Sequence, residues 1–195
     1  FVQLGTSTIR ALSDSSFGTL STAALSNMTT VQMSALTGTQ ISSVSPDGFA
    51  SLDPGVVAIL TSEQFVNLGT GQISVLTTAQ ANALTSAQTV GITSSQTSAL
   101  TEADLAKLST SAFAALTTAV VSNLSSTQFN ALGTAQIVAL TTAQAAALTS
   151  VQTVGLSNSQ AVVLETRDLA KIATDALDAV QLDVVSVLSN AKINN

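Results

Sequence analysis

The residues best suited to chemistry are few in this chain, and they are carboxylates. With no His and no Cys among 195 residues, the usual general bases, thiolate nucleophiles and most transition-metal ligands are missing. Asp104 and Asp168 attract attention because each lies three residues before a lysine, Lys107 and Lys171. On a helix this spacing predicts a local ion pair combined with a helix cap, rather than a catalytic pair.

Two further candidate sites are also weak. Asp47 and Asp53 lie near turn-like segments, but a Ca²⁺ site needs several converging oxygens, and glycine-rich calcium repeats are absent. The Gly-x-Gly of residues 69–71 lacks the strand and the third glycine of a nucleotide-binding turn, so it is interpreted as a variant cap. We therefore expect no catalytic, cofactor-binding or metal-binding residues, and no enzyme.

Composition limits the partners. The net charge is −6, and five basic residues spread over the chain cannot form the basic face that nucleic acid requires. No apolar run approaches the roughly 18 residues of a transmembrane helix, so no membrane-spanning segment is expected. Apolar residues make up 46% of the chain and charged residues only 8%, which favours a folded chain with a weakly charged surface.

The elements that must carry these residues follow an eight-residue period. Every eighth residue from Leu4 to Leu188 is apolar, which gives 24 consecutive octads without an insertion. If that residue is position one, the consensus is Leu–Thr/Ser–Thr/Ser–Ala–Gln–Ile/Phe–x–Ala. A hydroxyl at position two and Gln at position five form a capping box, and positions one and six form a hydrophobic staple. Pro46 and Pro54 fall at position three, the expected first helical residue.

The octad predicts an all-α solenoid of 24 repeats, each one short capped helix. A continuous helix is excluded because eight residues overshoot two full turns by about 80°, so the leucines would cover every face. We expect positions one and six and the alanines of positions four and eight inside. The alternative is a β-solenoid, but positions one and six have opposite parity and would lie on opposite faces of a strand.

The array is interpreted as a single domain, residues 1–195, with a longer period inside it. Residues 60–123 and 124–187 match octad by octad, and we expect this 64-residue unit to span a whole number of superhelical turns. The pattern weakens over residues 164–195, which are interpreted as a polar end cap or a junction. All six phenylalanines stand at position six: Phe1, Phe17, Phe49, Phe65, Phe113 and Phe129.

The recurring phrase Leu-Thr-Thr-Ala-Gln, seen at residues 76–80 and 140–144, resembles the repeat regions of large secreted bacterial adhesins and surface-matrix proteins. The resemblance implies export and a place at the cell surface or outside the cell. The resemblance extends over essentially the whole chain. The shared motif is mainly a matter of composition, so it does not indicate a specific partner.

Together these observations favour a non-enzymatic extracellular structural protein. It would self-assemble, end to end or laterally, into a surface filament, sheath or layer, or serve as a stiff adhesin stalk. The alternative is a module that binds ice or polysaccharide through regular Thr rows, such as Thr77-Thr78, Thr117-Thr118 and Thr141-Thr142. Partners other than a second copy or a polysaccharide are not expected.

Overall fold

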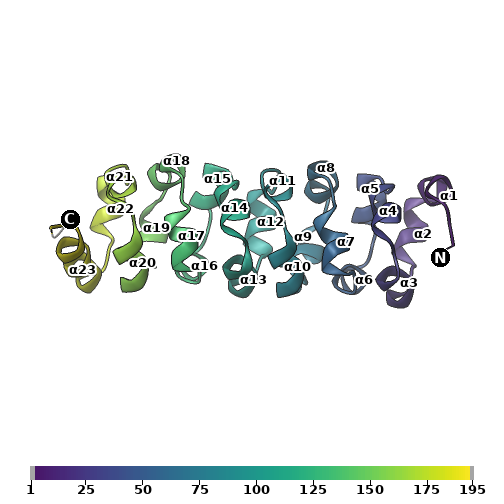
Figure 1. Cartoon of the computed structure of the whole chain (residues 1–195), viewed down its shortest axis with the longest axis horizontal. Coiled ribbons are helices and arrows are strands. Elements are labelled where there is room, and N and C mark those ends of the chain that lie inside the picture. Colours follow the sequence, from purple (N-terminus) through teal and green to yellow (C-terminus); the bar gives the residue numbers. More distant parts are fainter. Residues whose placement is uncertain (1–2, 194–195) are drawn as a thin grey trace.

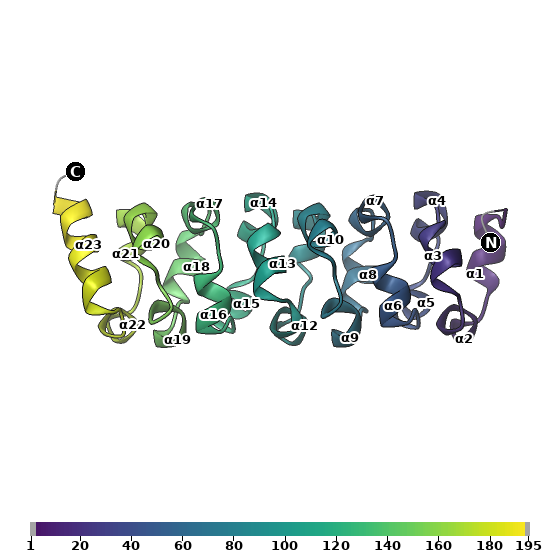
Figure 2. The ribbon, with the colours of Figure 1, turned by 90° about the horizontal axis from the view of Figure 1, so that it is seen from below.

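A computed structural model of the chain describes residues 3–193 and, apart from residues 182 and 189–193, their side chains. This part of the chain is an all-helical rod, as Figures 1 and 2 show. It contains 23 helices and no strand. The predicted helical solenoid is therefore confirmed, and the β-solenoid alternative is wrong. Phe1 lies outside the described residues.

The helix bounds follow the octads. In chain order the helices are α1 (Thr6–Ala11), α2 (Asp14–Gly18), α3 (Thr22–Ser26), α4 (Thr30–Ser34), α5 (Gly38–Ser42), α6 (Pro46–Ala50), α7 (Pro54–Ala58), α8 (Ser62–Val66), α9 (Thr70–Ile73), α10 (Thr78–Ala83), α11 (Ser86–Thr89), α12 (Ser94–Ala99), α13 (Glu102–Lys107), α14 (Thr110–Ala114), α15 (Thr118–Ser122), α16 (Ser126–Asn130), α17 (Thr134–Val138), α18 (Thr142–Ala146), α19 (Ser150–Thr153), α20 (Asn158–Val163), α21 (Thr166–Leu169), α22 (Thr174–Asp178) and α23 (Leu182–Ile193).

Each helix begins at position three of its octad, as the caps predict. The position-two residue is extended, as at Thr37 with φ −76° and ψ 162°, and its hydroxyl accepts from the backbone N–H of Gln40 at 3.1 Å. Both prolines are the first residue of a helix, where the missing N–H has no cost. The one departure is α23, whose 12 residues continue through position one of the last octad at Leu188.

The chain returns alongside itself after three octads. Each helix packs on the third helix along the chain, as α10 packs on both α7 and α13. A six-residue helix is too short to persist alone in water, so this stacking is what stabilises every octad. The stacked helices also wind slowly around the rod: α8 lies at the upper edge of Figure 1, whereas α20 lies at the lower edge.

This winding contradicts the expected role of the 64-residue unit. The helices α8 and α16 lie in equivalent octads, 64 residues apart in the sequence. They nevertheless lie at opposite edges of the rod in Figure 1. The 64-residue unit therefore does not bring its two copies to the same side of the rod, as a whole number of turns would. The 64-residue period is therefore a similarity in sequence only, and it does not determine the side of the rod on which an octad lies.

One continuous apolar core runs the length of the rod. Positions one and six fill it as expected, and the phenylalanines at residues 17, 49, 65, 113 and 129 are fully buried. The expectation for position four is wrong, because alanines such as Ala79 and Ala143 are exposed. Position eight is only half-buried at Ala83 and Ala147. The side chain that points into the rod is that of the position-five glutamine, and not that of the position-four alanine.

Candidate functional site: a glutamine ladder and an exposed valine ridge

The main polar feature of the interior is a ladder of buried glutamines. All twelve position-five glutamines are at most 7% exposed: Gln32, Gln40, Gln64, Gln72, Gln80, Gln88, Gln96, Gln128, Gln136, Gln144, Gln152 and Gln160. Position five lies four residues after the buried position one and next to the buried position six, so its side chain is carried inward. A primary amide has two donors and an acceptor to satisfy when it is buried.

The amide oxygen closes the predicted capping box. In every one of the twelve octads it accepts the backbone N–H of its own cap residue, for example Thr61 to Gln64 at 2.9 Å. Gly69 and Gly133 have no hydroxyl, so their octads keep only this half of the box. The capping box is therefore confirmed, and it accounts for one of the contacts of the amide.

The amide nitrogen makes the contacts that sequence reasoning missed. In all twelve octads Nε2 donates to the position-one carbonyl 28 residues earlier, which is in the neighbouring turn of the coil. Gln72, for example, donates to the carbonyls of Val44 and Ile41, both at 2.8 Å. Short helices leave carbonyls unpaired at their C-terminal ends. Each glutamine therefore supplies donors to one turn and an acceptor to the next.

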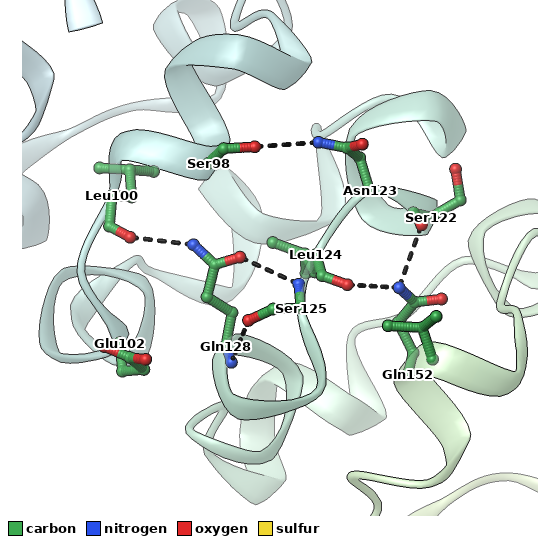
Figure 3. Close-up of a pocket in the computed structure, with 10 residues that line it drawn as sticks. Ser98, Leu100, Glu102, Ser122, Asn123, Leu124, Ser125, Gln128 and Gln152 are labelled. Atoms are coloured by element: carbon green, nitrogen blue, oxygen red, sulfur yellow. Dashed lines mark hydrogen bonds between the residues drawn. The ribbon is translucent and has the colours of Figure 1, made fainter.

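Figure 3 shows two rungs of this ladder beside an open groove. The amide of Gln128 donates to the carbonyl of Leu100 at 2.9 Å and accepts from the N–H of Ser125, while Gln152 donates to the carbonyls of Leu124 and Ser122. The groove has a volume of about 540 Å³, and the carboxylate of Glu102 and small polar side chains line its rim. The amides of both glutamines form hydrogen bonds that hold neighbouring turns of the coil together.

The predicted ion pairs of Asp104 and Asp168 are wrong. Within residues 3–193 neither carboxylate pairs with its lysine, because position five points into the coil and the lysine at position eight is exposed. The helix is capped by Thr101, whose hydroxyl accepts the backbone N–H of Asp104 at 3.2 Å and donates to Oδ2 of Asp104 at 2.7 Å. Asp168 instead lies 3.7 Å from Nε of Arg167.

On the outside, a row of apolar residues lies at or just beyond the C-terminal ends of the stacked helices α8, α11, α14, α17 and α20, and we call it the valine ridge. It consists of the position-seven residues Val66, Val90, Ala114, Val138 and Val162, which are 24 residues apart. The four valines are 41–52% exposed, and Ala114 is half-buried. The four octads at residues 84–91, 108–115, 132–139 and 156–163 contain no charged residue. Position seven is mostly Ser, Ala or Asn elsewhere, so a period of 24 was the signal that could have revealed the ridge.

Comparison with known proteins finds a repeat family. The family model described as the ALTTAQ repeat matches residues 121–158, which include the phrase Ala-Leu-Thr-Thr-Ala-Gln at residues 139–144. This stretch is similar to that family, which supports a repeat protein. No curated protein matches the chain. In the described part of the chain no helix has the length and apolar character needed to cross a bilayer, and no three His, Cys, Asp or Glu side chains are grouped as metal ligands.

Proposed function

We propose that this chain is a non-enzymatic structural repeat protein that works outside the cell by associating with further copies of itself. The observation that carries the proposal is the glutamine ladder. The buried polar side chains that the octads repeat are used to join one turn of the rod to the next. Such a design supports a stiff rod, and it leaves those side chains without a role in a reaction.

The valine ridge supports association between rods. Exposed apolar residues that recur in line mark interaction surfaces more often than scattered ones do. Because the stacked helices wind around the rod, the ridge faces different sides along the length of the molecule. One rod can thus contact neighbours on more than one side, which favours a bundle or a layer over a single closed pair. The absence of charge along four octads of the ridge removes repulsion between copies.

The alternative, a module for ice or polysaccharide, has no observation in its favour. The hydroxyls of Thr77, Thr117 and Thr141 accept backbone N–H groups as helix caps, so they are already used. The threonines that follow them begin helices that wind around the rod, which prevents a flat array on one side.

The test is electron microscopy of the untagged protein, combined with light scattering over a range of concentrations. We expect rods that associate side by side, and we expect Val90→Asp/Val138→Asp to give separate rods, because charge cannot be buried without a partner. Val31→Asp is the matched control, since Val31 is 62% exposed and lies on α4, outside the ridge. Single rods of the wild type at every concentration would contradict self-association. Unchanged association of the ridge variant would contradict the role of the ridge.

A further inference from the structure

Two rungs of the ladder carry a carboxylate in place of the amide. Asp104 and Asp168 stand at position five of equivalent octads, 64 residues apart, and each is 1% exposed. Every glutamine of the ladder donates to the position-one carbonyl 28 residues earlier. The corresponding carbonyls are those of Leu76 for Asp104 and Leu140 for Asp168. Among the described residues neither carbonyl oxygen accepts a hydrogen bond.

The carboxylate of Asp168 has one long ion-pair contact and no hydrogen bond among the described residues. Both of its oxygens are buried, and neither forms a hydrogen bond with any described residue. The guanidinium Nε of Arg167 lies 3.7 Å from Oδ1, but the Arg167 side chain is 64% exposed and pairs with Glu165 at 2.7 Å. At the equivalent rung the hydroxyl of Thr101 donates to Oδ2 of Asp104. A buried carboxylate is unfavourable unless a positive group or a hydrogen-bond donor lies beside it.

The space between the carboxylate and the carbonyl, which we call the slot, indicates which positive group can lie there. The amide nitrogens reach their carbonyls at 2.7–3.0 Å in rungs such as those of Gln64 and Gln88. Aspartate is one methylene shorter than glutamine, so we expect its oxygens to end about 1.5 Å further away, at roughly 4.4 Å from the carbonyl. A Ca²⁺ ion binds oxygens at about 2.3–2.6 Å, and two such bonds span this gap. Carboxylate and backbone carbonyl oxygens are the ligands that this ion prefers.

We propose that Asp168 with the carbonyl of Leu140, and Asp104 with the carbonyl of Leu76, each hold a Ca²⁺ ion where other rungs place the glutamine nitrogen. The carbonyls of Ile137 and Ile73 correspond to the second acceptor of a glutamine rung and extend each ligand set. The hydroxyl of Thr101 adds an oxygen at the first site. Water molecules complete the coordination. The proposal departs from the sequence-based expectation of no metal site, because that expectation counted side chains and not carbonyl oxygens.

The test uses the full chain, titrated with CaCl₂ after treatment with EDTA and followed by calorimetry and by thermal unfolding in circular dichroism. We expect two Ca²⁺ ions per chain, one in Asp104→Gln or in Asp168→Gln, and none in the double variant. Each site filled at about 100 times its Kd favours the folded state about 100-fold, so the wild-type melting temperature rises with Ca²⁺. The double variant regains both amide bridges, so we expect it to melt higher than the wild type in EDTA.

Glu63→Gln is the matched control, because it removes one negative charge from an exposed residue and should leave both ions bound. Two results would overturn the proposal. One is a wild type that binds no Ca²⁺ at millimolar concentration, which would leave a proton or a water molecule in the slot. The other is Ca²⁺ binding that persists in the folded double variant, which would place the ions elsewhere.

Discussion

Removing a single rung of the ladder should weaken the coil where that rung joins two turns. Gln80 is fully buried; its Oε1 accepts the N–H of Thr77 at 2.9 Å, and its Nε2 donates to the carbonyl of Leu52 at 2.8 Å. The variant Gln80→Met keeps the length of the side chain but leaves both backbone groups unpaired. The bond to Leu52 is buried, whereas Thr77 is exposed, so water can replace the partner that its N–H loses. An unsatisfied buried polar group costs about 1–3 kcal/mol, so we expect a loss of about 1–3 kcal/mol in the free energy of unfolding.

The assay has two parts. Urea unfolding followed by circular dichroism gives the change in stability, and hydrogen exchange followed by mass spectrometry reports on the segment that contains the N–H of Thr77. A loss of about 2 kcal/mol corresponds to exchange about 30-fold faster. Gln181→Ala is the matched control, because Gln181 is exposed and its Nε2 makes one hydrogen bond among the described residues, 3.4 Å long, to the carbonyl of Val154. We expect that variant to stay within about 0.5 kcal/mol of the wild type. If Gln80→Met had the same unfolding free energy and the same hydrogen-exchange rate as Gln181→Ala, the bridging role of the glutamine would be refuted.

Two further substitutions test how closely the turns fit. Gly155→Ala should cost about 1–3 kcal/mol in unfolding free energy, because a Cβ would overlap the backbone oxygen of Ser126. Gly133→Ala is its control: the nearest neighbour of that Cβ is 3.7 Å away, so stability should change by less than about 1 kcal/mol. Equal urea midpoints for these two variants would contradict the close approach at Gly155. Thr89→Val should cost about 1–3 kcal/mol, because the buried hydroxyl of Thr89 donates to the carbonyl of Ala112 at 2.7 Å. A Thr89→Val variant that unfolds at the wild-type urea concentration would show that this bond does not stabilise the rod.

Most of the local structure could be predicted from the octad. The helix starts, the proline positions and the burial of positions one and six follow from capping and staple rules that act within eight residues. These signals are local, so they needed no knowledge of how the turns stack. The stacking step of three octads was not predicted, because helix caps do not say which octads are neighbours in space.

The glutamine ladder was missed for a physical reason. The capping box explains the oxygen of residues such as Gln96 but leaves the two N–H donors of the amide without a partner. Counting those donors would have indicated a buried acceptor in another turn. The wrong expectation that Ala79 lies inside has the same cause. Small size and apolarity favoured a buried alanine, whereas the hydrogen bonds of Gln80 place the longer polar side chain there.

The ladder itself can be measured most directly by NMR of the glutamine side chains in the uniformly ¹⁵N,¹³C-labelled protein. The account predicts that the NH₂ groups of the twelve buried glutamines exchange slowly with water. It also predicts scalar couplings across hydrogen bonds from these nitrogens to carbonyls 28 residues earlier, such as Gln144 to Leu116. Side-chain amides that all exchange as fast as a free amide, without such couplings, would contradict a rod held together by its glutamines.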